Sequence, residues 1–156
     1  MPTLDALIPV RYVPAAVLVA LTVAGCSKNV SPASGDSPAA PMAIVHAADL
    51  PIEVQHAPLV VQEAYRYAVA NPEMLKQVGC YCGCGGIGHT SDYSCFVAGH
   101  DSSGATVYDG HALGCSICVD IARDVMRLDA EGRDNGAIRA YIDAEYSKYG
   151  PSNRSR

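Results

Sequence analysis

The chain has 156 residues, a formal net charge of −5, seven cysteines, one phenylalanine and no tryptophan. The acidic balance and the lack of any Lys/Arg cluster exclude nucleic acid and an anionic membrane surface as expected partners. The length suits one small domain with a modest hydrophobic core.

The N-terminal segment predicts an exported, lipid-anchored protein. Arg11 precedes an apolar stretch over residues 13–23, and the chain then continues with Ala24-Gly25-Cys26. This ending resembles the lipobox of bacterial lipoprotein signal peptides, which has small residues at the cleavage point. The resemblance implies that residues 1–25 are removed and that Cys26 is acylated, so that lipid holds the protein on the extracytoplasmic side of the bacterial membrane. An uncleaved anchor is disfavoured, because so short a run cannot span a bilayer of roughly 30 Å.

Residues 26–57 predict a disordered tether. They are rich in Ala, Pro, Ser and Gly, and such a composition cannot bury a core. His46 and His56 lie in this segment and are expected to be solvated linker residues rather than ligands. The folded domain is therefore expected to cover residues 58–150.

Four helices are expected in this domain. Apolar spacing predicts the first over residues 58–70, and a proline at the first helical position starts a second short helix that ends near residue 78. A third begins at Cys115 and stops at Gly132, and the last covers residues 134–149. The side chains expected to be buried are Val61, Ala64, Tyr65 and Ala68, then Ile117, Ile121, Val125 and Leu128, and finally Ile138, Tyr141, Ile142 and Tyr146.

The segment between the second and third helices predicts irregular structure followed by a hairpin. Five of the ten residues in 79–88 are glycine, which lets the backbone fold tightly but disfavours helix and regular strand. Residues 93–98 and 105–108 predict two short strands around a glycine-containing turn. The expected fold class is a small, mainly α, single domain with an irregular Cys/Gly-rich loop and a short β-hairpin.

Six cysteines carry the chemistry of the chain: Cys80, Cys82, Cys84, Cys95, Cys115 and Cys118. Alternate side chains of an extended backbone point the same way, so the first three sulfur atoms are expected to converge. Such neighbours stand at about the upper limit of the separation that a disulfide spans, which disfavours pairing inside the run. Cys115 and Cys118 open a helix, where the helix dipole is expected to lower the pKa of their thiols.

Histidines follow the cysteines closely in sequence. Gly-His pairs recur at intervals of eleven residues, and they contain His89, His100 and His111. We expect His89 and His111 to be imidazole ligands, with a hydrogen bond to a loop as the alternative role, and we leave His100 out of the site. No carboxylate is expected in the core of the cluster, and Tyr81 is expected to point away from the sulfur atoms. Such donors suit Cu(I), Zn(II) or an iron–sulfur cluster and do not suit Mg(II) or Ca(II).

Together these residues form the pattern Cys80-Tyr81-Cys82-Gly83-Cys84-Gly85, then Gly88-His89, Cys95-Phe96, His111 and Cys115-x-x-Cys118. The pattern resembles the PCYCGC-motif family of bacterial lipoproteins, and the likeness covers residues 60–149. The proline that opens the motif is replaced by Gly79 here, which should loosen the backbone before Cys80 without removing a sulfur atom. The resemblance implies a family, while the function has to come from the residues.

Our preferred hypothesis is a non-catalytic lipoprotein that binds a soft metal ion for sequestration or delivery. Cu(I) is favoured, because it accepts low coordination numbers and shares thiolates, and Zn(II) is the alternative metal. A protein that donates or accepts the metal would be its partner. The expected ligands are Cys80, Cys82, Cys84, Cys95, Cys115, Cys118, His89 and His111.

Two other functions stay open. The even number of clustered cysteines also allows three disulfides that staple an interaction domain without metal. A thiol–disulfide oxidoreductase acting through Cys115 and Cys118 is the third hypothesis, because residues 132–150 are similar to the tail of the cytochrome c maturation thiol-reductase family. No residue is assigned a catalytic role in the preferred hypothesis.

Overall fold

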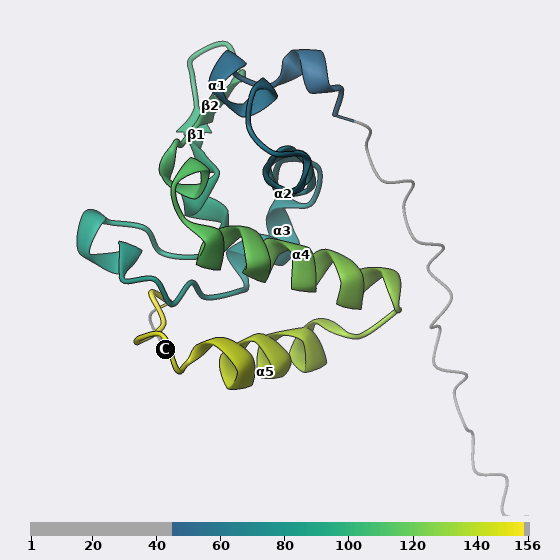
Figure 1. Ribbon diagram of the computed structural model, residues 1–156, viewed down its shortest axis with the longest axis vertical. Helices are drawn as coiled ribbons and strands as arrows, with labels where there is room; N and C mark the ends of the chain where they lie inside the picture. Colours follow the sequence, from purple (N-terminus) through teal and green to yellow (C-terminus); the bar gives the residue numbers. More distant parts are fainter. Residues whose placement is uncertain (1–44, 155–156) are drawn as a thin grey trace, which may run out of the picture. The chain divides into compact units, whose positions relative to one another are not determined.

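A computed structural model describes residues 45–154, and in them the chain is mainly α-helical with a two-stranded antiparallel sheet (Figure 1). The predicted fold class is confirmed. The signal peptide, Cys26 and residues 26–44 of the predicted tether lie outside the described residues. None of the helices described is long and apolar enough to cross a membrane. The helices are α1 (Ile52–Gln55), α2 (Leu59–Ala70), α3 (Pro72–Lys76), α4 (Ser116–Ala130) and α5 (Asn135–Tyr146), and the strands are β1 (Val97–His100) and β2 (Thr106–Tyr108).

Folded structure begins earlier than residue 58, where the sequence predicted that it would start. A 3-10 turn, η1, covers Ala47–Asp49, and α1 follows it. Leu50, which lies between the two, and Val54 of α1 are buried. The Gln55 side chain donates to the Leu50 carbonyl at 2.7 Å, and the Gln62 side chain of α2 donates to the Gln55 carbonyl at 2.9 Å. The predicted tether is therefore wrong for residues 45–57, because two apolar side chains in a Pro- and Ala-rich segment are enough to anchor it.

The main core lies between α2, α4 and α5. Helix α4 packs against α2 and also against α5, which runs back along it after a short turn (Figure 1). Gly132 follows the end of α4 and has φ 74°, the left-handed conformation that stops a helix. The Asp134 carboxylate caps α5 by accepting from the Ala137 N–H at 2.9 Å. Val61 and Ile117, predicted to be buried, are only half-buried. The predicted residues that are buried are Ala64, Tyr65, Ala68, Ile121, Val125, Leu128, Ile138, Ile142 and Tyr146.

Tyr141 departs from the predicted core. Its side chain is 40% exposed, and the Arg127 guanidinium lies 5.5 Å from the centre of its ring. The buried stripe of α5 runs through Ile138, Ile142 and Tyr146, which are four residues apart, so Tyr141 falls at the edge of that stripe.

The hairpin is shorter than predicted. Strands β1 and β2 pair antiparallel from Val97 opposite Tyr108 to His100 opposite Thr106. Residues 93–95, predicted as strand, form a 3-10 turn, η3 (Tyr93–Cys95), that turns Cys95 into the interior. The Tyr65 and Phe96 rings meet edge to face at 5.1 Å, which packs the start of the hairpin against α2.

The C-terminal tail, residues 150–154, extends the domain beyond the predicted end at residue 150. Figure 1 shows the tail beside the loop that follows α3. The backbone N–H of Asn153 donates to the Cys80 carbonyl at 3.0 Å, and the Asn153 side-chain oxygen accepts from the backbone N–H of Cys80 at 2.8 Å. A Cβ on Gly150 would approach the Tyr81 carbonyl oxygen to 2.9 Å, so glycine permits this close contact.

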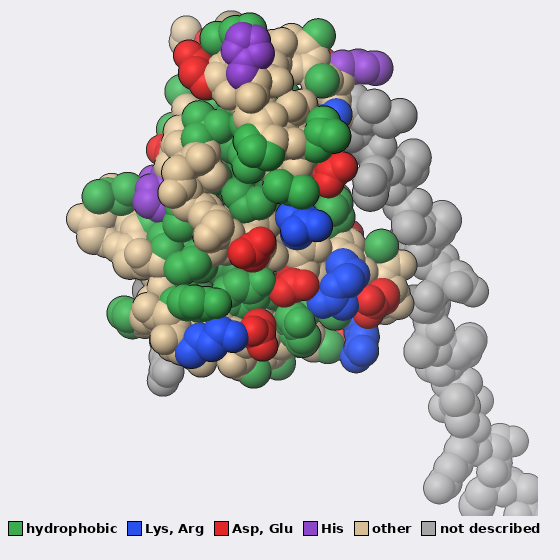
Figure 2. All heavy atoms as spheres, viewed as in Figure 1, with side chains coloured by type: hydrophobic (Ala, Val, Ile, Leu, Met, Phe, Trp, Pro, Cys, Tyr) green, Lys and Arg blue, Asp and Glu red, His purple; other side chains and the backbone are tan. Residues whose placement is uncertain are grey.

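Charged side chains of both signs are interspersed on the face drawn in Figure 2. Arg127 pairs with Asp124 at 2.9 Å and with Glu131 at 3.0 Å along the exposed side of α4. Such exposed pairs contribute little to stability. This face offers no basic patch of the kind that would bind a polyanion.

Candidate metal centre

Sulfur atoms from three segments converge at one end of α4. The Cys80 sulfur lies 3.4 Å from those of Cys82 and Cys118, and Cys82 and Cys118 are 3.7 Å apart. Cys84 and Cys95 meet at 3.6 Å. A disulfide would need about 2.05 Å. All six cysteines of the described part are free thiols, and the predicted convergence is confirmed.

Two features of the loop direct its cysteines inward. Gly83 has φ 87° and Gly88 has φ 95°, so both use the left-handed conformation that glycine adopts without strain. Between them η2 (Cys84–Ile87) forms a single tight turn. Gly83 lies between Cys82 and Cys84, and the sulfur atoms of Cys80, Cys82 and Cys84 lie within 4.8 Å of one another.

Cys115 and Cys118 lie at the start of α4, as predicted, but the predicted pKa effect is wrong for Cys118. The pKa of the Cys118 thiol is raised, because of its hydrogen-bonding contacts with Cys80 and Cys95 and because it is buried. The pKa of Cys80 is well below its usual value, because of its hydrogen-bonding contacts with Cys118 and Cys95. Contacts between the sulfur atoms therefore outweigh the helix dipole in setting the pKa values of these thiols.

The two histidines predicted as ligands lie beside these sulfur atoms. His111 Nε2 is 3.3 Å from the Cys82 sulfur, and the His89 and His111 rings meet edge to face at 5.1 Å. His89 Nδ1 is buried and has no hydrogen-bond partner among the residues that the structure describes. His100, at the end of β1, is exposed and outside the cluster, as are His46 and His56.

Asp109 supports both of these histidines, and the sequence did not single it out. Its Oδ2 lies 3.4 Å from His89 Nε2, and its Oδ1 accepts from the backbone N–H of His111 at 2.8 Å. Its carbonyl accepts from the Tyr65 hydroxyl at 2.7 Å, which fixes the segment on α2. A carboxylate behind an imidazole orients a metal-binding histidine. An acidic residue two positions before His111 was the available signal.

Asp92 corrects the expectation that no carboxylate enters the cluster. Its side chain is fully buried, and neither carboxylate oxygen has a hydrogen-bond partner in the described part of the chain. Burial and the nearby charge of Cys80 raise the pKa of Asp92 well above its usual value. In a 3-10 turn residues three apart lie on the same side, so η3 brings Asp92 and Cys95 together where a strand would have separated them.

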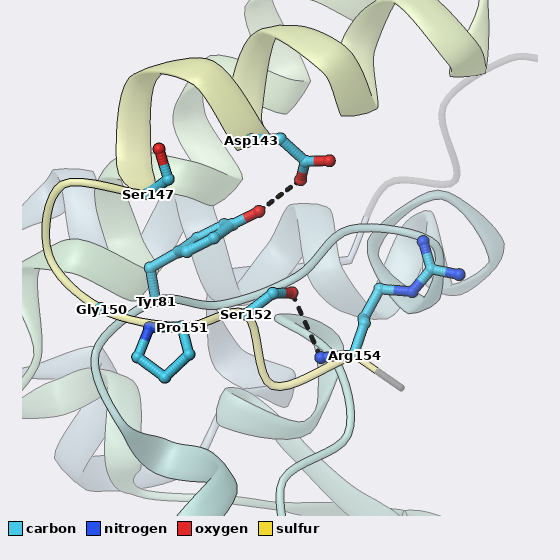
Figure 3. Close-up of a pocket in the computed structure, with 7 residues that line it drawn as sticks. All are labelled: Tyr81, Asp143, Ser147, Gly150, Pro151, Ser152 and Arg154. Atoms are coloured by element: carbon cyan, nitrogen blue, oxygen red, sulfur yellow. Dashed lines mark hydrogen bonds between the residues drawn. The ribbon is translucent and has the colours of Figure 1, made fainter. Parts of the chain in front are cut away.

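The tail and Tyr81 hold the loop from outside. The Asn153 side chain donates to the Cys84 sulfur at 3.3 Å and to the Ser91 carbonyl at 3.1 Å. Tyr81 points away from the sulfur atoms, as predicted, and its hydroxyl donates to the Asp143 carboxylate of α5 (Figure 3). Its ring lines a pocket of about 530 Å³ between α5 and the tail.

The donor set is compatible with metal binding. Four groups of side chains bring their ligand atoms within 4.8 Å of one another, and these groups include all eight predicted ligands and also Asp92. Thiolates and imidazoles are soft or borderline ligands. His89 and Asp92 each have buried atoms without a hydrogen-bond partner among the described residues, and each lies in a group with Cys95, where a cation would satisfy such atoms.

Fold and site define a small α-rich domain with a buried cysteine and histidine cluster. Residues 15–154 match the model of a family described as proteins of unknown function with a PCYCGC motif. The chain belongs to this family, as the sequence predicts. No curated protein and no solved structure matches the chain.

Proposed function

We propose that the protein binds a soft metal ion, Cu(I) in preference to Zn(II), and sequesters or delivers it outside the cytoplasm while lipid on Cys26 holds it at the membrane. The observation that carries this proposal is the contact of sulfur atoms from three segments at 3.4–3.7 Å, with two imidazoles beside them. A storage or delivery role needs no catalytic residue, and none is assigned.

The spacing of the sulfur atoms supports a metal ion better than a set of thiols. Tetrahedral binding with metal–sulfur bonds of about 2.3 Å places sulfur atoms about 3.8 Å apart, close to the distances found. Thiols are weak hydrogen-bond donors, so hydrogen bonds between buried thiols compensate poorly for the burial of the sulfur atoms. A cation replaces those protons and neutralises the thiolates, which makes metal affinity fall as the pH falls.

The choice of metal follows from how the donors are shared. The sulfur atoms of Cys80, Cys82 and Cys118 contact one another. If two ions bind in this cluster, a single thiolate can therefore be a ligand of both. Cu(I) suits such shared thiolates. Zn(II) is the second candidate, because the groups with three cysteines and one histidine, or two of each, have donor sets that zinc also uses.

Accessibility supports exchange with a partner protein. Cys82 and Cys115 are only half-buried, whereas Cys80, Cys95 and Cys118 are fully buried. A thiolate of a donor or acceptor protein could reach the first two. The same burial disfavours an oxidoreductase that attacks through Cys118, because this thiol is inaccessible and its pKa is raised. The separations between sulfur atoms disfavour the disulfide-stapled alternative.

A titration with matched variants tests the metal proposal. The full chain is titrated anaerobically with Cu(I), and in parallel with Zn(II), against a chromophoric chelator of known affinity. We expect wild type and Ser116→Ala, an exposed change in the same helical turn, to compete, and Cys118→Ser to bind fewer ions or to bind more weakly. Circular dichroism checks that the variants fold. Equal binding by Cys118→Ser, or no binding by wild type, would overturn the proposal.

The lipid anchor has a separate test. The chain is produced in a bacterial host, and its membrane and soluble fractions are compared by immunoblot. We expect wild type in the membrane fraction and Cys26→Ser in the soluble fraction or retained as an unprocessed precursor. Processing and membrane attachment of Cys26→Ser equal to those of wild type would contradict lipidation at this residue.

A further inference from the structure

We infer that the cluster offers two adjacent positions for soft metal ions, an outer and an inner one. This inference rests on the proposed function and specifies how the site is divided. The outer position consists of Cys82, Cys115, Cys118 and His111, and the inner position consists of Cys84, Cys95, His89 and His111.

Each position is a complete ligand set. All four ligand atoms of each group lie within 4.8 Å of one another, a spread that one tetrahedral ion can bridge. His111 is the only residue that the two groups share. The other six side chains therefore divide into two sets without overlap, and together they exceed the four ligands that one ion takes.

Cys80 and Asp92 lie between the two positions. Cys80 is 3.4 Å from Cys118 of the outer position, and both Cys80 and Asp92 also group with Cys95 of the inner position. A thiolate at Cys80 can bridge two ions, and the two unpartnered oxygen atoms of Asp92 can serve either ion. The most buried residues of the cluster thus lie where the two positions meet.

The inner position has its own evidence of ligation in His89. One nitrogen of this imidazole faces Asp109 at 3.4 Å, while the other, Nδ1, is buried without a partner. This is the arrangement of a metal-binding histidine whose second nitrogen is oriented by a carboxylate. Asp109 also accepts from the His111 backbone N–H at 2.8 Å, so the carboxylate that faces the His89 imidazole also fixes the backbone that carries His111.

The two positions differ in access to solvent. Three of the four residues of the outer position are half-buried, whereas Cys84 and Cys95 of the inner position are buried to 3% and 0% exposure. An ion at the outer position should therefore exchange faster with a chelator. We expect release in two phases, and loss of the fast phase when the outer position is removed.

Native mass spectrometry counts the ions directly. The full chain is titrated anaerobically with Cu(I), and Cys115→Ser, which affects only the outer position, is compared with His89→Gln, which affects only the inner one. His100→Gln, an exposed Gly-His histidine outside the cluster, is the control. We expect two ions in wild type and in the control and one ion in each of the other variants, with His111→Gln weakening the binding of both. Half-buried Cys115 and His89 are chosen so that the variants keep the fold, which circular dichroism verifies.

Three results would overturn the two-position arrangement. One ion, or more than two, in wild type contradicts it while leaving metal binding intact. Loss of both ions in Cys115→Ser or in His89→Gln indicates a single indivisible centre, and retention of both ions in either variant excludes that residue's position. No ion bound by wild type contradicts this inference and the proposed function together.

Discussion

The helical core and the cysteine cluster are held together by different means. In α2, α4 and α5, apolar side chains at helical spacing pack into one core, and the backbone satisfies its own hydrogen bonds. In residues 79–95, short turns and glycines replace regular structure, and buried atoms of Asp92 and His89 have no hydrogen-bond partner among the described residues. The first region is complete as protein, whereas the second has buried polar atoms that the proposed metal ion would satisfy.

Metal removal should separate the two regions most clearly. Binding stabilises the folded state by about 4 kcal/mol when free metal is 1,000 times Kd. We expect a chelator to increase amide hydrogen exchange strongly over residues 79–95 and much less over Ser116–Ala130 and Asn135–Tyr146. Hydrogen exchange with mass spectrometry, with and without Cu(I), measures this. Equal changes in both regions, or no change in either, would contradict the distinction.

A cavity in the helical core should act in the opposite way. Ile142 is fully buried, and Ile142→Ala is expected to lower the free energy of unfolding by about 2–5 kcal/mol, because it removes apolar contacts and leaves a cavity. Urea unfolding measures the loss, and the number of ions bound at saturation should stay that of wild type. A change in this number would mean that the two regions are not separable.

Asp109→Asn should weaken the metal centre through its histidines. The amide keeps the shape of the side chain but removes the charge that faces His89, and such a change behind a ligand typically costs 10- to 100-fold in metal affinity, so about that loss is expected. Chelator competition measures the affinity, and Asp120→Asn, an exposed change on α4, is the control. Equal affinities for both variants would remove Asp109 from the site.

The contact between loop and tail should give the smallest effect. A Cβ on Gly79 would come within 2.2 Å of the Ser152 hydroxyl oxygen, so Gly79→Ala is expected to cost about 1 kcal/mol as the tail shifts. Adding Ser152→Gly should recover most of this loss, because it removes the side chain that clashes. Thermal or urea unfolding of the two single variants and the double variant gives the coupling energy. Additive losses would show that the contact is unimportant.

Helical spacing and alternation along the cysteine run predicted much of this molecule. Apolar spacing located α2, α4 and the buried residues of α5, because a helix repeats its faces at a fixed interval. Alternation predicted that the sulfur atoms of Cys80, Cys82 and Cys84 converge, and they do, although a left-handed Gly83 and the turn at Cys84 stand where an extended chain was assumed. Both predictions depend only on local geometry.

The parts that sequence did not predict depend on long-range contacts. Asn153 reaches Cys80 across 73 residues, and no local pattern marks an asparagine near the C-terminus as a partner of the loop. Asp92 was missed because the 3-10 turn that follows it, Tyr93–Cys95, was predicted as strand, and it is this turn that brings Asp92 to the side of Cys95. Residues 45–57 were missed because composition outweighed the two buried side chains of Leu50 and Val54.

The most direct test of metal binding is elemental analysis combined with a count of free thiols. The full chain would be purified anaerobically without chelator, analysed by inductively coupled plasma mass spectrometry, and labelled at its thiols after the metal has been removed. We predict copper at one or more ions per chain and six labelled cysteines within residues 80–118. A protein with no metal and no free thiols in this segment would contradict the account and identify a disulfide-stapled domain.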